Sequence, residues 1–274
     1  MLSETVVLLG QGMYQTIPDK IKINALPTSS ELEYVGSEDF DSTMVKSILP
    51  KIVEDSEGMD FNELLEIDYE WICRCIRMKT YGPYFTVNRI YCPECNKSHE
   101  GQYKVDLRCV GINALPKNFV NRMVISHDEF IDVKDDIVVQ LMTIRDHLAM
   151  ENDKLFMRAN GTRNITLARI CYMIKQIGNN EHMTPVDVRT YILKNFSAAD
   201  YEILKSLVGE CDNYGLQITG QVTCPVCGSK DGYFIALRQD KFFRPTVGDI
   251  REFKSAIRSG DWKKLPGDPA GYVR

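Results

Sequence analysis

The chain begins with short alternations of hydrophobic and polar residues. Within 17–23, Ile21 and Ile23 alternate with lysines, which is the period of a half-buried strand. The apolar run 5–9 predicts another short strand, separated from the first by a Gly-rich turn. We therefore expect short β segments near the N-terminus.

Helical periodicity follows these segments. Residues 28–34 and 39–53 are predicted helices, and Pro50 predicts an end or a kink in the second, because proline lacks the amide hydrogen that the helix needs. Residues 60–65 carry a capping pattern before two leucines, which predicts a separate helix, and 68–76 place their apolar residues on one face of the next.

From 116 to 220 the pattern favours helices throughout. Apolar stripes predict helices over 135–150 and 164–177. Thr184 stands before a proline and an acid, which is a strong helix start, and 197–200 gives a similar signal. This stretch is interpreted as a mainly α-helical insertion.

Two similar segments carry the candidate chemistry. The first is Cys92-Pro93-Glu94-Cys95, which follows the predicted strand 85–90, and the second is Cys224-Pro225-Val226-Cys227. Predicted strands at 221–223 and 233–237 flank the second segment, so each Cys-Pro-x-Cys is expected at the tip of a β hairpin. The turn presents both sulfurs of a pair to one point, and two pairs supply the four thiolates of a closed, tetrahedral zinc site. With all four positions taken by protein, we expect one structural zinc ion and no metal-centred catalysis.

Distance along the chain does not prevent the two pairs from sharing an ion. The 128 residues between Cys95 and Cys224 cost roughly 4 kcal/mol in loop-closure entropy. A structural zinc site contributes about 10–16 kcal/mol at neutral pH. The ion can therefore hold the ends of the insertion together.

Three other interpretations of the pairs stay open at this stage. They could be buried thiols or redox pairs, or two half-sites that another chain completes, or His99 or His182 could replace one cysteine as a ligand. The remaining cysteines have no partner at ligand spacing and are interpreted as core or surface thiols: Cys73, Cys75, Cys109, Cys171 and Cys211.

Composition and motifs exclude several functions. The 274 residues carry a net charge of −5, so the chain has no general attraction to nucleic acid or to anionic membranes. No segment has the signal-peptide or membrane-span pattern, which predicts synthesis in the cytosol, where thiols stay reduced. No phosphate-binding loop or nucleophile–histidine–carboxylate pattern is present, and the charged residues 127–129 are interpreted as a solvated turn. We expect no enzyme activity and no small-molecule substrate.

A zinc-ribbon module that binds nucleic acid is the alternative function. Such ribbons place basic and aromatic residues around their knuckles. The first pair is surrounded by Glu94, Lys97 and Glu100, and the second by Lys230 and Asp231. Neither is a basic platform, so nucleic acid is not the expected partner.

Several motifs in order resemble the T-even-type tailed-phage baseplate protein family. They are Gly10-Gln11-Gly12-Met13-Tyr14, the helix with Arg74 and Arg77 that leads into Tyr81-Gly82, the first knuckle, the helix start Ala198-Ala199-Asp200, the second knuckle with Gly228, and Phe242-Phe243-Arg244-Pro245. The resemblance covers roughly residues 7–110 and 197–245. The stretch 116–196 is longer than the family pattern requires, and the tail after Thr246 has no counterpart in it.

The resemblance implies a structural subunit in the hub or inner wedge of a contractile-tail baseplate. Such a subunit would be made in the host cytoplasm, enter the virion and bind other tail proteins. The expected fold is α+β, with a split zinc ribbon. Its predicted parts are a body with the first knuckle (1–115), the helical insertion (116–220), the second knuckle (221–245) and an extended C-terminal arm (246–274). Residues 242–245 would cover the ribbon core or anchor a neighbouring subunit.

Overall fold

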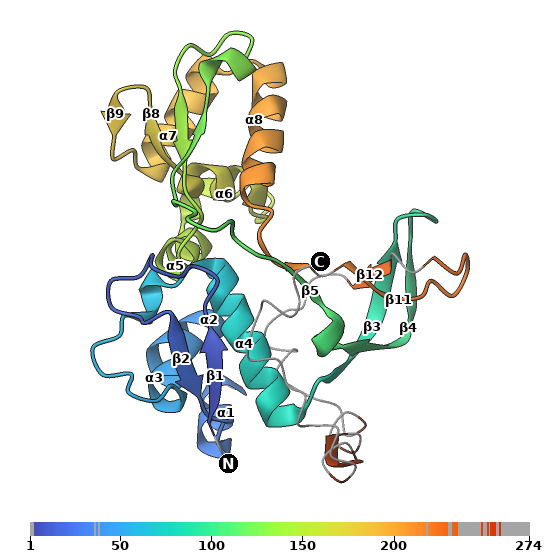
Figure 1. Ribbon diagram of the computed structural model, residues 1–274. Coiled ribbons are helices and arrows are strands. Elements are labelled where there is room, and N and C mark those ends of the chain that lie inside the picture. The colour runs from blue at the N-terminus through green and yellow to red at the C-terminus, as the bar shows by residue number, and fades with distance from the viewer. Residues whose placement is uncertain are drawn as a thin grey trace. The chain divides into compact units, whose positions relative to one another are not determined.

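The protein consists of two compact units (Figure 1). The computed structural model describes residues 3–35, 37, 39–217, 219–229 and 232–234, together with 248, 251, 253–255 and 258. Unit 1 contains residues 1–61, 67–115 and 215–274, and unit 2 contains 62–66 and 116–214. Both units mix helices with small antiparallel sheets, so the mixed class predicted from sequence is confirmed.

Unit 1 opens with the two predicted strands, which pair with each other. Strands β1 (Glu4–Val7) and β2 (Lys20–Ile23) are antiparallel, and Ile21 and Ile23 are buried as their alternation requires. The predicted helix 28–34 is present as α1 (Thr28–Val35).

The predicted helix 39–53 is present as a short α-helix, a π-helical turn and a second short α-helix. Helix α2 (Phe40–Thr43) continues into a π-helical turn (Met44–Ile48) and then into α3 (Leu49–Ile52). Pro50 lies in the first turn of α3. Because proline cannot donate a hydrogen bond to the preceding turn, the helix widens just before it, which is the predicted kink.

Helix α4 (Glu66–Tyr81) is the longest helix among the described residues. The separate helix predicted at 60–65 is wrong, because only a 3-10 turn (Phe61–Glu63) forms there. The segment that follows is instead held by an isolated bridge between Leu65 and Thr143. A short antiparallel pair, β5 (Gly111–Asn113) with β10 (Gly215–Gln217), lies where the chain returns to unit 1.

Unit 2 combines helices with a four-stranded sheet. Its helices are α5 (Ile144–Asn152), α6 (Ile165–Met173), α7 (Pro185–Asn195) and α8 (Ala198–Cys211). Its strands, in spatial order, are β6 (Met123–Ile125), β7 (Ile137–Val139), β8 (Ile174–Ile177) and β9 (Asn180–Glu181). The predicted solvated turn is a 3-10 turn, His127–Glu129, with all three residues exposed.

The expectation of a mainly α-helical insertion is therefore wrong in two places. Residues 137–139 form β7 and residues 174–177 form β8, where helices were predicted. All three residues of β7 are buried, so both faces of this strand are covered, and in the sheet it lies between β6 and β8. An apolar run of this kind has no alternation, so its periodicity cannot be told from that of a buried helix.

The predicted helix starts in unit 2 are confirmed. Thr184 caps α7, and its capping box with Asp187 is complete. Ser197 caps α8 by accepting a hydrogen bond from the amide of Asp200. Helix α5 begins after a second capping box, formed by Thr143 and Asp146.

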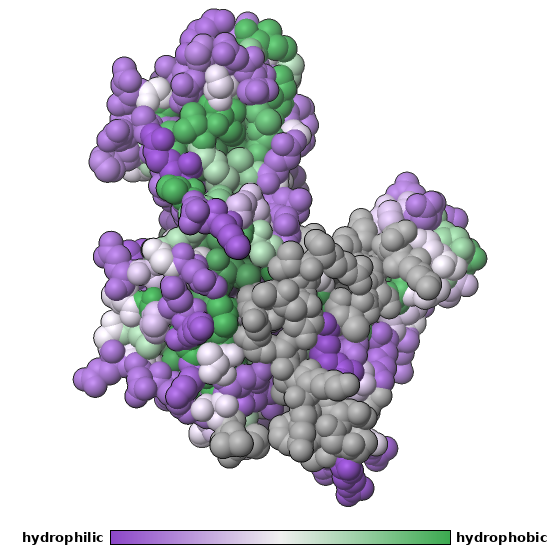
Figure 2. Space-filling view, viewed as in Figure 1, coloured by the Kyte–Doolittle hydropathy of each residue, from purple (hydrophilic) through white to green (hydrophobic). Residues whose placement is uncertain are grey.

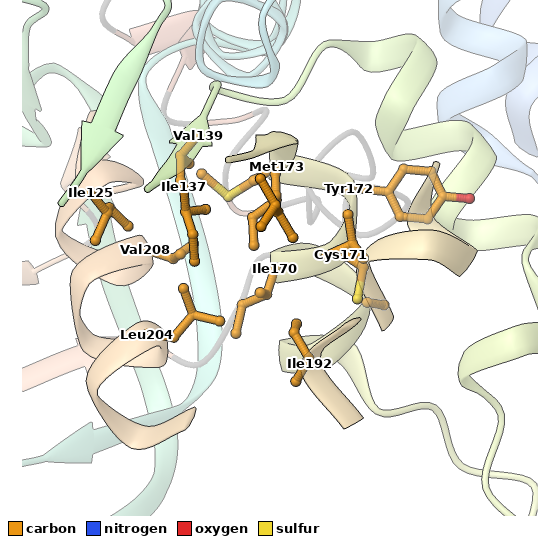
Figure 3. Packing of buried hydrophobic residues seen from close by; sticks show 14 of the residues in the cluster. Ile125, Ile137, Val139, Ile170, Cys171, Tyr172, Met173, Ile192, Leu204 and Val208 are labelled. Atoms are coloured by element: carbon orange, nitrogen blue, oxygen red, sulfur yellow. The ribbon is translucent and has the colours of Figure 1, made fainter. Parts of the chain in front are cut away.

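The core of unit 2 lies between its sheet and its helices (Figure 3). Side chains of the strands, among them Ile125, Ile137 and Val139, face side chains of α6 and α8, among them Ile170 and Leu204. The helices α6, α7 and α8 all contribute to this single cluster. Unit 2 therefore has a hydrophobic core of its own.

Helix α4 carries buried polar side chains that bind the backbone of unit 1. Arg77 donates two hydrogen bonds of 2.9 Å, to the carbonyl oxygens of Gly82 and Tyr84. Arg74 donates to the carbonyl of Leu107, and the Asp68 carboxylate accepts the amides of Leu9 (2.5 Å) and Gly10 (2.8 Å) and the Tyr14 hydroxyl. Burial raises the pKa of Asp68 to about 6, against the lowering effect of these donors. The motifs at 10–14, 74–77 and 81–82 thus meet around one helix.

The turn after α4 also supports the beginning of the C-terminal arm. Gly82 has a φ of +87°, and a Cβ there would lie 2.5 Å from Phe253 Cδ2 and 2.9 Å from Phe253 Cβ. The described residues of 248–258 are helical, so this part of the arm is not extended. The motif 242–245 and residues 259–274 lie outside the described residues.

Replacing Gly82 with alanine is expected to destabilise unit 1 by about 2–3 kcal/mol. About 1–2 kcal/mol comes from the left-handed backbone conformation, and the remainder from overlap with Phe253, whose Cβ cannot rotate away. Gly58→Ala is the matched control, because Gly58 has a similar φ of +83° and open space around its Cβ position. Chemical unfolding of the two variants measures the difference, and equal losses would contradict the contact with Phe253.

Candidate metal centre

The first cysteine pair lies at the tip of a long hairpin. Strand β3 (Tyr84–Cys92) pairs with β4 (Lys97–Asp106), and the last pair in register is Cys92 with Lys97. Asn96 closes the turn with a positive φ of 52°, and its amide donates to the carbonyl of Pro93 (3.2 Å). The predicted strand 85–90 is confirmed, and Asn96 takes the conformation that the turn requires.

The second pair lies in the longer connection between β11 (Thr219–Val222) and β12 (Gly232–Phe234). The amide of Gly228 donates to the carbonyl of Cys224 (3.0 Å), and the amide of Cys224 donates to the carbonyl of Ser229 (2.7 Å). Gly228 has a φ of +73°, a conformation that glycine adopts without strain. The predicted strand residues 235–237 lie outside the described residues.

Sheet pairing brings the two hairpins together. The strand order is β11-β12-β3-β4, and β12 pairs with β3 through Tyr233 with Tyr91 and Phe234 with Ile90. The two cysteine turns therefore lie at the same end of one four-stranded sheet, although 128 residues separate them. Strand pairing carries part of the entropic cost of bringing them together.

The four sulfur atoms form a compact group. The Sγ atoms of Cys92, Cys95, Cys224 and Cys227 all lie within 4.8 Å of one another. The distance is 3.6 Å between Cys92 and Cys227, and 3.8 Å between Cys95 and Cys224. A tetrahedron with zinc–sulfur bonds of about 2.3 Å has edges of about 3.8 Å. The four cysteines can therefore hold a metal ion, and their spacing and donor type fit zinc.

Backbone amides favour a thiolate at Cys224, whereas burial and the neighbouring sulfurs oppose one at Cys95. Burial alone would raise the pKa of Cys224, but amide groups of Cys227 and Val226 donate to its sulfur and lower that pKa to about 6. The pKa of Cys95 is raised to about 12, first by its hydrogen bond with Cys227 and then by burial. Without a cation, the four thiols thus share very little negative charge. Four thiolates this close together would repel one another, and a divalent cation would offset that repulsion and bind all four as thiolates.

The other candidate ligands lie outside the sulfur cluster. His99 Nε2 lies 3.5 Å from Cys224 Sγ, yet the atoms that cluster within 4.8 Å are the four sulfurs. His182 is an exposed residue of unit 2 with a φ of +66°. Cys73, Cys75, Cys171 and Cys211 are not in this cluster, which is the one such group among the residues with a described position. The side chain of Cys109 is outside the described set.

The sequence suggested His99 only as an alternative ligand and did not predict its contact with Cys224. The signal was present in the hairpin register, because His99 pairs with Ile90 and so lies on the same sheet face as Ile90 and Cys92. What could not be read from the sequence was the position of Cys224 relative to that face.

Fold and site together define a class of protein: a two-unit α+β chain in which four cysteines that could hold a metal ion cluster between hairpins from distant parts of the sequence. The family model of the T4 bacteriophage base plate protein matches residues 13–244. The chain belongs to this baseplate protein family, and the resemblance found in its motifs is confirmed. Comparisons with curated proteins and with solved structures find no match.

Membership of this family indicates a structural role in the phage tail baseplate, with other tail proteins as partners. In the part of the chain that the structure describes, no helix is long and apolar enough to cross a membrane.

Proposed function

We propose that the chain is a structural subunit of the hub or inner wedge of a contractile-tail baseplate, and that it carries one structural zinc ion. It has no enzymatic role and acts through contacts with other tail proteins after synthesis in the host cytoplasm. The ligands are Cys92, Cys95, Cys224 and Cys227. The observation that carries the proposal is the baseplate family match over 13–244, and the sulfur cluster supports the zinc site.

The chemistry of the site supports a fastening role. Four protein sulfurs fill a tetrahedral coordination shell, so a bound zinc ion would have no free position for water or substrate. A bound ion would attract each of the four thiolates, which would otherwise repel one another. The chain's own residues hold the geometry: β12 beside β3 sets the distance between the turns, and the amides of Val226 and Cys227 hold Cys224.

Exposed apolar side chains support a role in protein contacts. On the face of unit 2 seen in Figure 2, hydrophobic residues form a patch bordered by hydrophilic ones. Large contiguous apolar patches mark interaction surfaces, whereas hydrophobic residues exposed singly are normal on any protein. The large hydrophobic residues of unit 2 that are at least 44% exposed are Val120, Val124, Ile131, Met157, Ile165, Val186 and Leu193.

We also infer a separate role for each segment of the chain. The body (1–115) and the second knuckle (221–245) are fastened by zinc, the insertion (116–220) presents unit 2, and the arm (246–274) contacts a neighbouring subunit. The assignment of the arm rests on its sequence, which is rich in glycine, proline and charge.

Phages whose copy of this chain ends at Arg258, which keeps Phe253 beside Gly82, are expected to assemble fewer complete tails, because the rest of the arm would no longer reach its neighbour. Electron microscopy counts the tails, and mass spectrometry of purified tails measures how much of the chain they contain. A full-length chain with Lys205→Met is the control, since Lys205 is an exposed residue of unit 2 paired with Glu202.

Three results would count against the proposal. Wild-type tails that lack the chain would remove the baseplate role itself. Truncated chains that enter tails in normal amounts would remove the role of the arm. Salt-dependent DNA binding by the purified protein at physiological ionic strength would favour the nucleic-acid module instead.

A further inference from the structure

We propose that His99 is a positioning residue for the metal centre, which donates its Nε2 hydrogen to the sulfur of Cys224 and thereby slows loss of the ion. This inference rests on the proposed zinc site. It concerns a residue outside the four ligands, and the contact it uses joins the first hairpin to the second knuckle.

The position of His99 follows from the hairpin register. In β4, His99 pairs with Ile90, and Lys97 pairs with Cys92. Directly opposed residues of an antiparallel pair share a sheet face, and alternate residues of one strand do as well. His99 therefore lies on the face that carries Cys92, two residues beyond the turn's last pair.

The distance fits a hydrogen bond to sulfur. His99 Nε2 lies 3.5 Å from Cys224 Sγ, and Cys224 is 2% exposed. A buried thiolate needs donors, because its charge is poorly solvated there. Backbone amides of Val226 and Cys227 supply two donors from the knuckle itself, and His99 supplies one from the other hairpin.

A ligand role for His99 fits the structure less well. The four sulfurs already occupy the corners of a tetrahedron of suitable size, and the His99 nitrogen is not among the atoms that cluster within 4.8 Å. A tetrahedral zinc ion with four thiolates has no fifth position. His99 then acts on the ion through Cys224.

Loss of the His99 hydrogen bond should lower the affinity for zinc and raise the rate of zinc release. Groups that hydrogen-bond to metal ligands fix the orientation of those ligands, and their loss typically costs 10–100-fold in metal affinity. Because His99 holds Cys224 from the first hairpin, its loss removes a restraint on the movement of the second knuckle away from β3. Zinc would be released faster through that opening.

The test uses the full-length, zinc-loaded chain and the variants His99→Phe and His99→Gln. Phenylalanine fills the space without a donor, and glutamine keeps one. Transfer of zinc to a chromogenic chelator is expected to be 10–100-fold faster in His99→Phe than in the wild type, with most of the difference restored in His99→Gln. Tyr103→Phe, which removes a hydroxyl from the same strand away from the cysteines, should release zinc at the wild-type rate.

A second measurement separates positioning from ligation. The cobalt-substituted wild type and His99→Phe should share the sulfur-to-cobalt charge-transfer intensity of four thiolates. A change in that intensity in His99→Phe would identify His99 as a ligand and overturn the proposal, as would a wild-type release rate in that variant. If the wild type binds neither zinc nor cobalt, the metal site itself fails, which is a different result from either of these.

Discussion

Replacing Cys224 with serine is expected to lower the free energy of unfolding of unit 1 by at least about 3 kcal/mol. A structural zinc ion contributes about 10–16 kcal/mol in small zinc-dependent folds, and three thiolates hold it less tightly than four. Strand β12 joins the second hairpin to the first by pairing with β3 through two residue pairs in register. Without the ion, this second hairpin loses its main attachment to the first.

The same loss is expected for Cys92→Ser, because both sulfurs bind one ion. The double variant Cys92→Ser with Cys224→Ser should therefore lose little more than either single variant, which is a strong departure from additivity. Chemical unfolding measures the three losses, limited proteolysis reports release of the second hairpin, and elemental analysis should find one zinc per wild-type chain. Cys211→Ser, a half-buried thiol of α8, is the control and should keep both stability and zinc.

Additive losses from Cys92→Ser and Cys224→Ser would show that the pairs belong to separate sites. A wild-type protein without zinc, purified under reducing conditions, would remove the shared ion altogether.

Replacing Arg169 with methionine is expected to destabilise unit 2 by about 3 kcal/mol, the lower end of the cost of removing one partner of a buried ion pair, because the Arg169 side chain is 30% exposed. Arg169 Nη2 lies 2.5 Å from Glu66 Oε2 and donates to Asp212 Oδ1 at 3.0 Å, and a second bond joins its Nε to Asp212. The side chains of Glu66 and Asp212 are 15% and 19% exposed. Methionine fills much of the volume of arginine but leaves both carboxylates without this cation.

These contacts matter because of where the carboxylates lie in unit 2. Glu66 ends the segment 62–66, and Asp212 stands two residues before the last residue of the unit. The chain leaves unit 2 after Glu66 and after Tyr214. Arg169, in the middle of α6, therefore binds one carboxylate close to each of these two points. His147 Nδ1, 3.0 Å from Glu66 Oε1, adds to the same network.

The loss in Arg169→Met should depend on pH. Burial alone would raise the pKa of Glu66, but His147 and Arg169 lower it to about 2 from 4.5. A carboxylate with a lowered pKa contributes stability above its unfolded pKa, and this contribution disappears as the pH falls toward the folded value. A shift of this size corresponds to roughly 3 kcal/mol. The difference between wild type and variant should thus be full at pH 7 and shrink between about pH 4.5 and pH 2.

Urea unfolding at several pH values measures this difference. Lys205→Met is the matched control, since it breaks an exposed pair in the same unit and should cost less than about 1 kcal/mol. A loss in Arg169→Met that is equally small, or that does not change with pH, would mean that the network contributes no net stability.

The sequence by itself determined the features that depend on a few neighbouring residues. The capping of α7 by Thr184 and of α8 by Ser197 is encoded within three residues, and Pro50 marks the kink after the π-helical turn Met44–Ile48. The two Cys-Pro-x-Cys turns are equally local, because a proline and a residue with positive φ suffice to present two sulfurs on one side.

Only the tertiary structure decided which elements have neighbours on every side. Residues 137–139 become a strand because β6 and β8 pair with them on both edges, and nothing within the segment records those partners. The same holds for His99 beside Cys224 and for Arg169 between Glu66 and Asp212, residues that lie 125, 103 and 43 positions apart. Local backbone preferences act over a few residues, whereas burial and ion pairing depend on which distant segments the fold brings together.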